Sequence, residues 1–275
     1  MKYERRSPRE QEKRYPREDK RRYADPEPEE NEGQIEGRNA LTEALRSGRT
    51  IDKVFVAAGD TDRSLQRLAA QAKEAGAVVV PVDRRKLDAM STSHSHQGVI
   101  ALVAAREYFS LDDILEEAAS RGENALIVIC DELSDPHNLG AILRSAECAG
   151  AHGVIIPKRR SVGLTAVVAK ASAGAVEYMK VARVTNITAA IQELKEKGVW
   201  IFGTAAEGSI PMYDADLKGP TAIVIGNEGD GMSRLVRESC DVTVHIPMKG
   251  RISSLNASNA ASILLYEAVR QRSGR

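Results

Sequence analysis

Residues 221–232 read TAIVIGNEGDGM, a β-branched apolar run followed at once by three glycines within six positions. Glycines between a strand and a helix let the backbone approach a ligand closely and leave amide groups free to bind it. The order G-x-x-G-x-G is not the dinucleotide fingerprint G-x-G-x-x-G, and the chain has no Walker A pattern. A plain structural turn is the alternative, but a turn seldom needs so many glycines. We predict a buried strand that ends in a ligand-binding loop.

Strands and helices alternate on both sides of this stretch. From residue 125 onward, short Val- and Ile-rich runs are separated by amphipathic helices, which predicts an α/β fold with a mostly parallel sheet covered on both faces. Ligands bind at the carboxyl ends of such strands, so the loops after Cys130, Thr204, Gly226 and Pro247 should carry the chemistry. The predicted strands are 125–130, 153–157, 178–184, 199–204, 221–226 and 242–247.

Two further loops contain polar residues at such positions. Residues 131–138 lead into a helix that contains Gly140 and Arg144; Asn138 can be a helix N-cap and Arg144 a solvated side chain. Residues 246–258 read IPMKGRISSLNAS, a basic turn rich in Ser and Asn. Such a turn suits phosphate or ribose recognition, although Ser and Asn also cap helices and form turns. Neither loop alone identifies a function.

The N-terminal part predicts a small α/β domain, 33–105, behind a charged tail. Its expected helices are 38–47 and 61–75, and its expected strands are 51–57, 77–82 and 98–104. Residues 106–122 form a linker in which Ser110 and Asp113 have capping-box spacing, and 123–275 form the second domain. Residues 1–32 combine many charges with almost no aliphatic side chains, which predicts a disordered tail. A solubilising extension and a basic arm that touches RNA are equally good interpretations.

Composition restricts the class of protein. The 39 basic and 39 acidic residues cancel, so any nucleic-acid surface must be a local patch. No membrane-length apolar segment or secretory signal is present, so we predict a soluble cytoplasmic protein without a membrane partner. Cys130, Cys148 and Cys240 form no disulfide framework and are expected to be buried free thiols. His94 and His96 lack a further ligand at metal spacing, so we predict no metal site.

Taken together, the three loops resemble the signature motifs of the SpoU/TrmH branch of the SPOUT methyltransferases. The resemblance covers roughly residues 105–275. It rests on Asn138-Leu139-Gly140 with Arg144, on Ile225-Gly226-Asn227-Glu228-Gly229 with Gly231, and on Ile246-Pro247-Met248 with Ser253-Ser254-Leu255-Asn256-Ala257-Ser258.

The smaller domain carries a second resemblance. Residues 35–41, IEGRNAL, and 95–99, SHQGV, are similar to the N-terminal RNA-binding domain of one subgroup of this family. That domain is similar to certain ribosomal proteins, and the subgroup methylates a guanosine of large-subunit ribosomal RNA. These motifs are less specific than those of the catalytic domain.

The resemblance implies a mechanism and a set of residues. The implied reaction transfers a methyl group from S-adenosyl-L-methionine to a ribose 2′-hydroxyl of RNA. The implied catalytic residues are Arg144, Asn138, Glu228, Ser254 and Asn256. The cofactor would be held mainly by backbone near Thr204, Gly226, Ile246 and Leu255. The family fold also contains a deep C-terminal trefoil knot and is usually a homodimer, and general rules of chain topology would not predict the knot.

Two alternatives remain open from the sequence. The same chemistry can act on transfer RNA, because relatives in the family do so. An RNA-binding assembly factor without catalysis is a different class, although the joint presence of Asn138, Arg144, Glu228 and Asn256 argues against it. DNA is not an expected partner.

Overall fold

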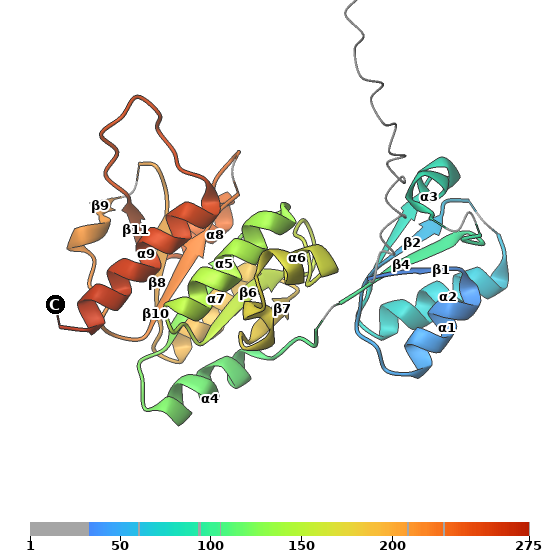
Figure 1. The fold of residues 1–275 in the computed structure, drawn as a ribbon, viewed down its shortest axis with the longest axis horizontal. Coiled ribbons are helices and arrows are strands. Elements are labelled where there is room, and N and C mark those ends of the chain that lie inside the picture. Colours follow the sequence, from blue (N-terminus) through green and yellow to red (C-terminus); the bar gives the residue numbers. More distant parts are fainter. Residues whose placement is uncertain are drawn as a thin grey trace, which may run out of the picture. The chain divides into compact units, whose positions relative to one another are not determined.

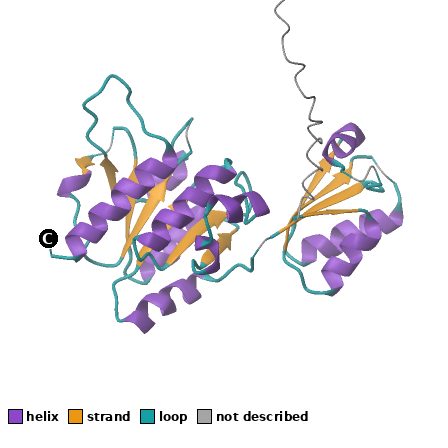
Figure 2. Cartoon of the chain, viewed as in Figure 1, coloured by secondary structure: helices purple, strands orange, loops and turns teal. Residues whose placement is uncertain are grey.

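The computed structural model describes residues 33–59, 61–92, 95–104, 106–207, 209–227 and 229–274. The predicted tail, 1–32, lies outside these residues. The described residues belong to one compact unit, which contains a four-stranded and a seven-stranded sheet (Figures 1 and 2). Within the described ranges, no helix combines the length and apolar character needed to cross a bilayer.

The four-stranded sheet has the order β1-β4-β2-β3, with β2 and β3 parallel and the other pairs antiparallel. Helices α1 and α2 bury Leu41, Leu65 and Leu68 against one face, and Leu87 of α3 packs with Ile100 in a separate apolar cluster. The bounds are β1 Gln34–Glu36, α1 Arg38–Arg46, β2 Ile51–Ala57, α2 Arg63–Glu74, β3 Val78–Val82, α3 Arg84–Met90 and β4 Val99–Val103. The predicted elements are present to within two residues at each end.

Two elements here were not predicted. Strand β1 has only three residues, and α3 buries a single leucine, Leu87, so neither shows a full period of apolar positions. The predicted capping box is confirmed: the Ser110 hydroxyl accepts from the Asp113 amide at 3.1 Å, and the Asp113 carboxylate accepts from the Ser110 amide at 2.7 Å. It begins α4 (Leu111–Arg121), which Gly122 ends in a left-handed conformation.

All pairs of the seven-stranded sheet are parallel, in the order β7-β6-β5-β10-β8-β11-β9. The mostly parallel sheet is therefore confirmed. The bounds are β5 Leu126–Cys130, β6 Gly153–Pro157, β7 Val181–Val184, β8 Trp200–Thr204, β9 Ile210–Pro211, β10 Thr221–Ile225 and β11 Val242–His245. Strands β5, β6 and β10 are buried along their whole length, as strands covered on both faces must be.

Helices cover both faces of this sheet (Figure 2). Alternate residues of β5 point to opposite faces: Val128 joins a core with α5, α6 and α9, whereas Ile127 joins a core with α4, α7 and α8. The bounds are α5 Pro136–Cys148, α6 Ala166–Ala171, α7 Ile187–Glu196, α8 Arg234–Ser239 and α9 Ala257–Arg272, with short 3₁₀ helices η1 Ala175–Glu177 and η2 Met212–Asp214.

Strand β7 and the three cysteines differ in part from the prediction. The predicted strand 178–184 begins only at Val181, because the chain before it turns through η1. The three cysteines are free, as predicted, but Cys148 is exposed at the end of α5 and only Cys130 is fully buried. Burial raises the pKa of the Cys130 thiol to about 12, which makes it unreactive near neutral pH.

An ion pair joins the two sheets. The Arg183 guanidinium on β7 donates to the Asp52 carboxylate on β2 at 2.7 Å and to the Asp52 carbonyl at 2.9 Å. The Tyr108 hydroxyl donates to the other Asp52 oxygen at 2.9 Å. Both charged side chains are almost fully buried, so removing one partner would leave an uncompensated charge.

Candidate active site

The loops predicted to carry the chemistry meet at the carboxyl edge of the seven-stranded sheet. Strands β5, β10, β8 and β11 are neighbours in the sheet and run parallel, so they end at the same edge. The Asp131 amide donates to the Ile225 carbonyl at 2.8 Å, and the Thr204 hydroxyl donates to the Val224 carbonyl at 2.8 Å. These contacts hold the ends of the strands together just where the loops begin.

The glycine-rich loop turns back on itself. The Asn227 amide donates to the Gly231 carbonyl at 3.1 Å, and the Asn227 side-chain oxygen accepts from the amides of Gly229 at 2.9 Å and Asp230 at 2.7 Å. A Cβ on Gly226 would lie 2.2 Å from the carbonyl carbon of Gly231. Any side chain at Gly226 is therefore excluded. Glu228, the catalytic candidate in this loop, lies outside the described residues.

Asp131 fixes the far end of the same loop. Its carboxylate accepts from the Ser233 amide at 2.7 Å, and the residue is only 3% exposed. The sequence interpretation missed this role. The available signal was an acidic residue directly after a strand that is buried along its whole length.

Asn138 and Asn256 meet although 118 positions separate them in the chain. The Asn256 side-chain amide donates to the Asn138 oxygen at 2.9 Å, while the Asn256 oxygen caps α9 by accepting from the Ser258 amide at 2.9 Å. The interpretation of Asn138 as a helix N-cap is wrong. Asp135 caps α5, which leaves Asn138 buried within the first turn of that helix.

The other predicted catalytic residues differ in their surroundings. Arg144 is exposed on α5, and among the described residues its guanidinium has no hydrogen bond or ion pair, so it is available to a ligand. Ser254 and Leu255 lie in the exposed segment before α9. The structure thus brings Asn138 and Asn256 together, and it gives Ser254 no hydrogen-bond partner in the part of the chain that it describes.

The predicted cofactor positions fit a ligand that is held by backbone. Thr204, Gly226 and Ile246 follow or end β8, β10 and β11, which are adjacent in the sheet. Leu255 immediately precedes the Asn256 cap of α9. The absence of a Cβ at Gly226 lets the backbone of Gly231 and Met232 pack directly against this residue, which fixes the conformation of the loop.

The two sequence stretches of the smaller sheet that carry the second resemblance also lie side by side. The Gln97 side-chain oxygen accepts from the Arg38 amide at 3.3 Å, and the Arg38 Nε donates to the Gln97 carbonyl at 3.1 Å. His96 is held by Asp88 at 2.9 Å and by the Gly98 amide at 3.0 Å, which gives it a structural role. His94 lies outside the described residues, and no cluster suited to a metal ion occurs within them.

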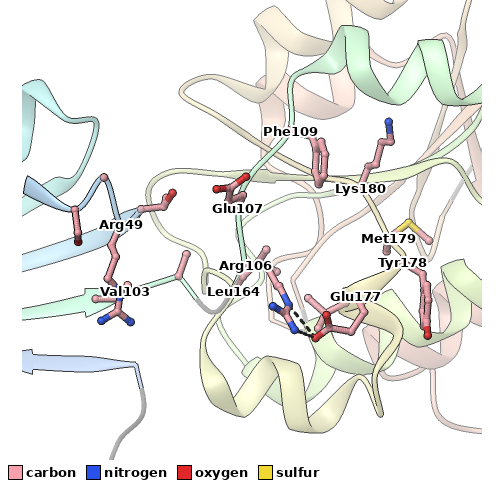
Figure 3. A pocket seen from close by; sticks show the side chains of 15 residues that line it. Arg49, Val103, Arg106, Glu107, Phe109, Leu164, Glu177, Tyr178, Met179 and Lys180 are labelled. Carbon is pink, nitrogen blue, oxygen red and sulfur yellow. Dashed lines mark hydrogen bonds and ion pairs between the residues drawn. The ribbon is translucent and has the colours of Figure 1, made fainter. Parts of the chain in front are cut away.

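A cavity of about 710 Å³ lies elsewhere and contains none of the predicted site residues. Figure 3 shows its wall, where Arg106 Nε donates to Glu177 at 2.8 Å. Its lining comes from residues 47–50, 103–104, 106, 107 and 109, Leu164 and residues 176–180. We therefore locate the site by the convergence of the loops and not by cavity size.

Comparison with known proteins agrees with this location. Residues 125–266 match the sequence profile described as the SpoU rRNA Methylase family, and residues 34–109 match the profile "RNA 2'-O ribose methyltransferase substrate binding". Fold and site define an RNA 2′-O-ribose methyltransferase that uses S-adenosyl-L-methionine. The chain belongs to the SpoU rRNA Methylase family, because that match spans more than half of its length.

Relatives and solved structures support the same class. The "Putative TrmH family tRNA/rRNA methyltransferase YacO" of Bacillus subtilis is 48% identical over 86% of this chain and 94% of its own length. The SpoU methyltransferase AviRb of Streptomyces viridochromogenes, solved with AdoMet, is 28% identical with a TM-score of 0.57, over 88% of this chain and 91% of its own. An AdoMet-bound rRNA methyltransferase of Sinorhizobium meliloti is 27% identical with a TM-score of 0.55, over 86% and 87%. The predicted family, reaction class and cofactor are confirmed.

Proposed function

We propose that the protein methylates the ribose 2′-hydroxyl of a guanosine in large-subunit (23S) ribosomal RNA, as the enzyme RlmB does. The observation that carries this proposal is the substrate-binding part of the chain, in which Gly37-Arg38 and His96-Gln97-Gly98 are held together by Arg38 and Gln97. Both stretches resemble the RNA-binding domain of the subgroup with that substrate.

Arg144 is proposed to bind the phosphate beside the target ribose and to stabilise the developing alkoxide. A guanidinium keeps its proton above about pH 12, so it is unsuited to act as the general base. Its planar donors suit a phosphate, and its exposure without a partner in the described residues leaves it free for this role. The phosphate itself is a candidate for the proton acceptor.

Asn138 is proposed to position the reacting ribose, with its amide oriented by the hydrogen bond from Asn256. Holding the hydroxyl in line with the methyl group removes entropy from the barrier. Glu228 and Ser254 are assigned to the same site by their place in the family motifs. S-adenosyl-L-methionine, when bound, supplies the electrophilic methyl group.

The cofactor is proposed to lie against the backbone near Thr204, Gly226, Ile246 and Leu255. Support comes from the adjacent ends of β8, β10 and β11 and from the close backbone packing at Gly226, which fixes the loop at the end of β10. The deep trefoil knot of the family is proposed for this C-terminal part, and a fold similar to certain ribosomal proteins is proposed for residues 33–105.

We also propose the homodimer that is usual in this family, with cytoplasmic localisation. The segment before α9 exposes three apolar side chains, Met248, Ile252 and Leu255, and Ile252 is 73% exposed. Clustered exposed apolar residues are typical of surfaces that another molecule covers. The domain division is proposed as 33–105 for RNA binding, 106–122 for the linker and 123–275 for catalysis.

The test is transfer of labelled methyl from S-adenosyl-L-methionine to unmodified large-subunit ribosomal RNA and, separately, to transfer RNA, followed by mapping of the methylated nucleotide. We expect label in one guanosine of the ribosomal RNA and its loss in an Arg144→Ala variant. Label only in transfer RNA would overturn the substrate and keep the chemistry. Cofactor binding without transfer to either RNA would favour an assembly factor.

A further inference from the structure

Three consecutive cations, Lys158-Arg159-Arg160, follow β6 at the carboxyl edge of the seven-stranded sheet. Because β6 pairs in parallel with β5, this basic turn leaves the sheet beside the loop that leads to Asn138. Arg159 and Arg160 are exposed. No step of the proposed mechanism uses these side chains.

The backbone of the basic turn is held against the loop before α5. The Ser161 hydroxyl donates to the Leu133 carbonyl at 2.8 Å, and the Val162 amide donates to the same carbonyl at 2.9 Å. Two residues beyond Leu133, Asp135 caps the helix that carries Asn138. The turn therefore keeps a defined position relative to that helix.

Its other end is fixed to β7. The Lys158 amide donates to the Val184 carbonyl at 2.8 Å, and the Arg183 guanidinium reaches the Lys158 carbonyl at 3.4 Å. Between these anchors, Arg160 adopts a φ of 56°, a left-handed conformation that non-glycine residues rarely take. The anchors therefore hold the backbone of the turn at both ends, so the three cationic side chains project from defined positions.

The charge of the basic turn is only partly neutralised. Arg160 pairs with Glu132 at 3.0 Å, but within the described residues neither Lys158 nor Arg159 has an ion pair. The turn therefore carries an uncompensated positive charge at the edge of the sheet where the catalytic loops meet. Such charge favours a polyanion over a neutral or cationic ligand.

We propose that the basic turn, residues 158–160, binds the phosphate backbone of the substrate RNA next to the target nucleotide. This inference rests on the proposed RNA-methylating function and extends its substrate contacts to the strand next to the catalytic loop. Lys158 and Arg159 supply the phosphate contacts, and Arg160, through Glu132, holds the turn in place. These contacts orient the RNA and carry no base specificity.

The experiment measures binding of the full chain to unmodified large-subunit ribosomal RNA over a series of KCl concentrations, with methyl transfer as a separate readout. The variant is Arg159→Gln. The matched control is Lys218→Gln, which removes one exposed charge from the turn just before β10, at the opposite edge of the sheet. Arg159→Lys, which keeps the charge, is the conservative variant.

We expect Arg159→Gln to weaken RNA binding about fivefold to tenfold near 0.1 M salt. The variant should also reduce the steepness with which the logarithm of the binding constant falls with the logarithm of the salt concentration by about 0.7–0.9, because one phosphate contact is lost. Arg159→Lys should restore the slope, and affinity for S-adenosyl-L-methionine should stay at the wild-type value. Equal affinity and slope for Arg159→Gln and Lys218→Gln would overturn the proposal. Failure of the wild-type chain to transfer methyl would instead count against the proposed function, because that readout is independent of the comparison between variants.

Discussion

Substitution of Gly226 by alanine tests whether the glycine-rich loop binds the cofactor in the conformation described here. The new Cβ would lie 2.2 Å from the Gly231 carbonyl carbon and 2.3 Å from the Met232 nitrogen, whereas ordinary contacts begin near 3.4 Å. Both neighbours are backbone atoms, so no change of side-chain rotamer relieves the overlap.

The size of the effect follows from this overlap. Overpacking costs about 1–3 kcal/mol, and an overlap of more than about 1 Å with backbone belongs at the upper end. The loop follows the end of β10, so a change in the loop's conformation can relieve the overlap and leave the strands of the sheet in place. In the variant, the loop conformation described here is then a minor state whose free energy lies about 3 kcal/mol above that of the relaxed loop. If the cofactor binds only to this minor state, the apparent Kd for S-adenosyl-L-methionine rises by about 100-fold.

Calorimetric titration with S-adenosyl-L-methionine measures this change, and thermal unfolding shows that the variant is folded. Gly219→Ala is the matched control, because a Cβ there meets nothing within 4 Å and the residue lies before β10, away from the loop, so its affinity should stay near that of wild type. A folded Gly226→Ala protein that binds the cofactor within about threefold of wild type would refute the placement of the cofactor.

Three further outcomes are expected. Asn256→Asp keeps a good N-cap for α9 but removes the amide that donates to Asn138. We therefore expect an unfolding free energy within about 0.5 kcal/mol of wild type and a fall in kcat/KM of at least about tenfold. Full activity of this variant would show that Asn256 acts only as a helix cap. Gly140→Ala would place a Cβ 2.5 Å from the Cβ of Ala171. Because overpacking outweighs the gain in helix propensity, we expect urea unfolding to show a free energy of unfolding lower by about 1–2 kcal/mol. An unchanged free energy of unfolding would contradict the close packing of α5 on α6. Burial holds the pKa of His152 below its ordinary value of 6.5, so the unfolded chain takes up a proton that the folded protein does not. The free energy of unfolding should therefore decrease as the pH falls below about 6.5, and His152→Gln should make this decrease smaller; an identical pH dependence in the variant would refute the assignment.

Local patterns in the sequence were sufficient for most elements and for the positions of the motifs. The Val- and Ile-rich runs predicted the strands of the parallel sheet, and three glycines after β10 predicted the loop at its end. These features depend on side-chain periodicity and turn chemistry, which act over a few residues. Elements without a full period, such as α3, were missed for the same reason.

Only the tertiary structure decided which of the motif residues touch. The hydrogen bond from Asn256 to Asn138 and the one from Ser233 to Asp131 each span more than 100 positions. No local pattern encodes such contacts, because they depend on the strand order, which inserts β10 between β5 and β8. The same order brings the basic turn after β6 to the edge that carries Asn138. The chemistry of each loop can therefore be read locally, whereas their assembly into one site is a consequence of how the strands pack.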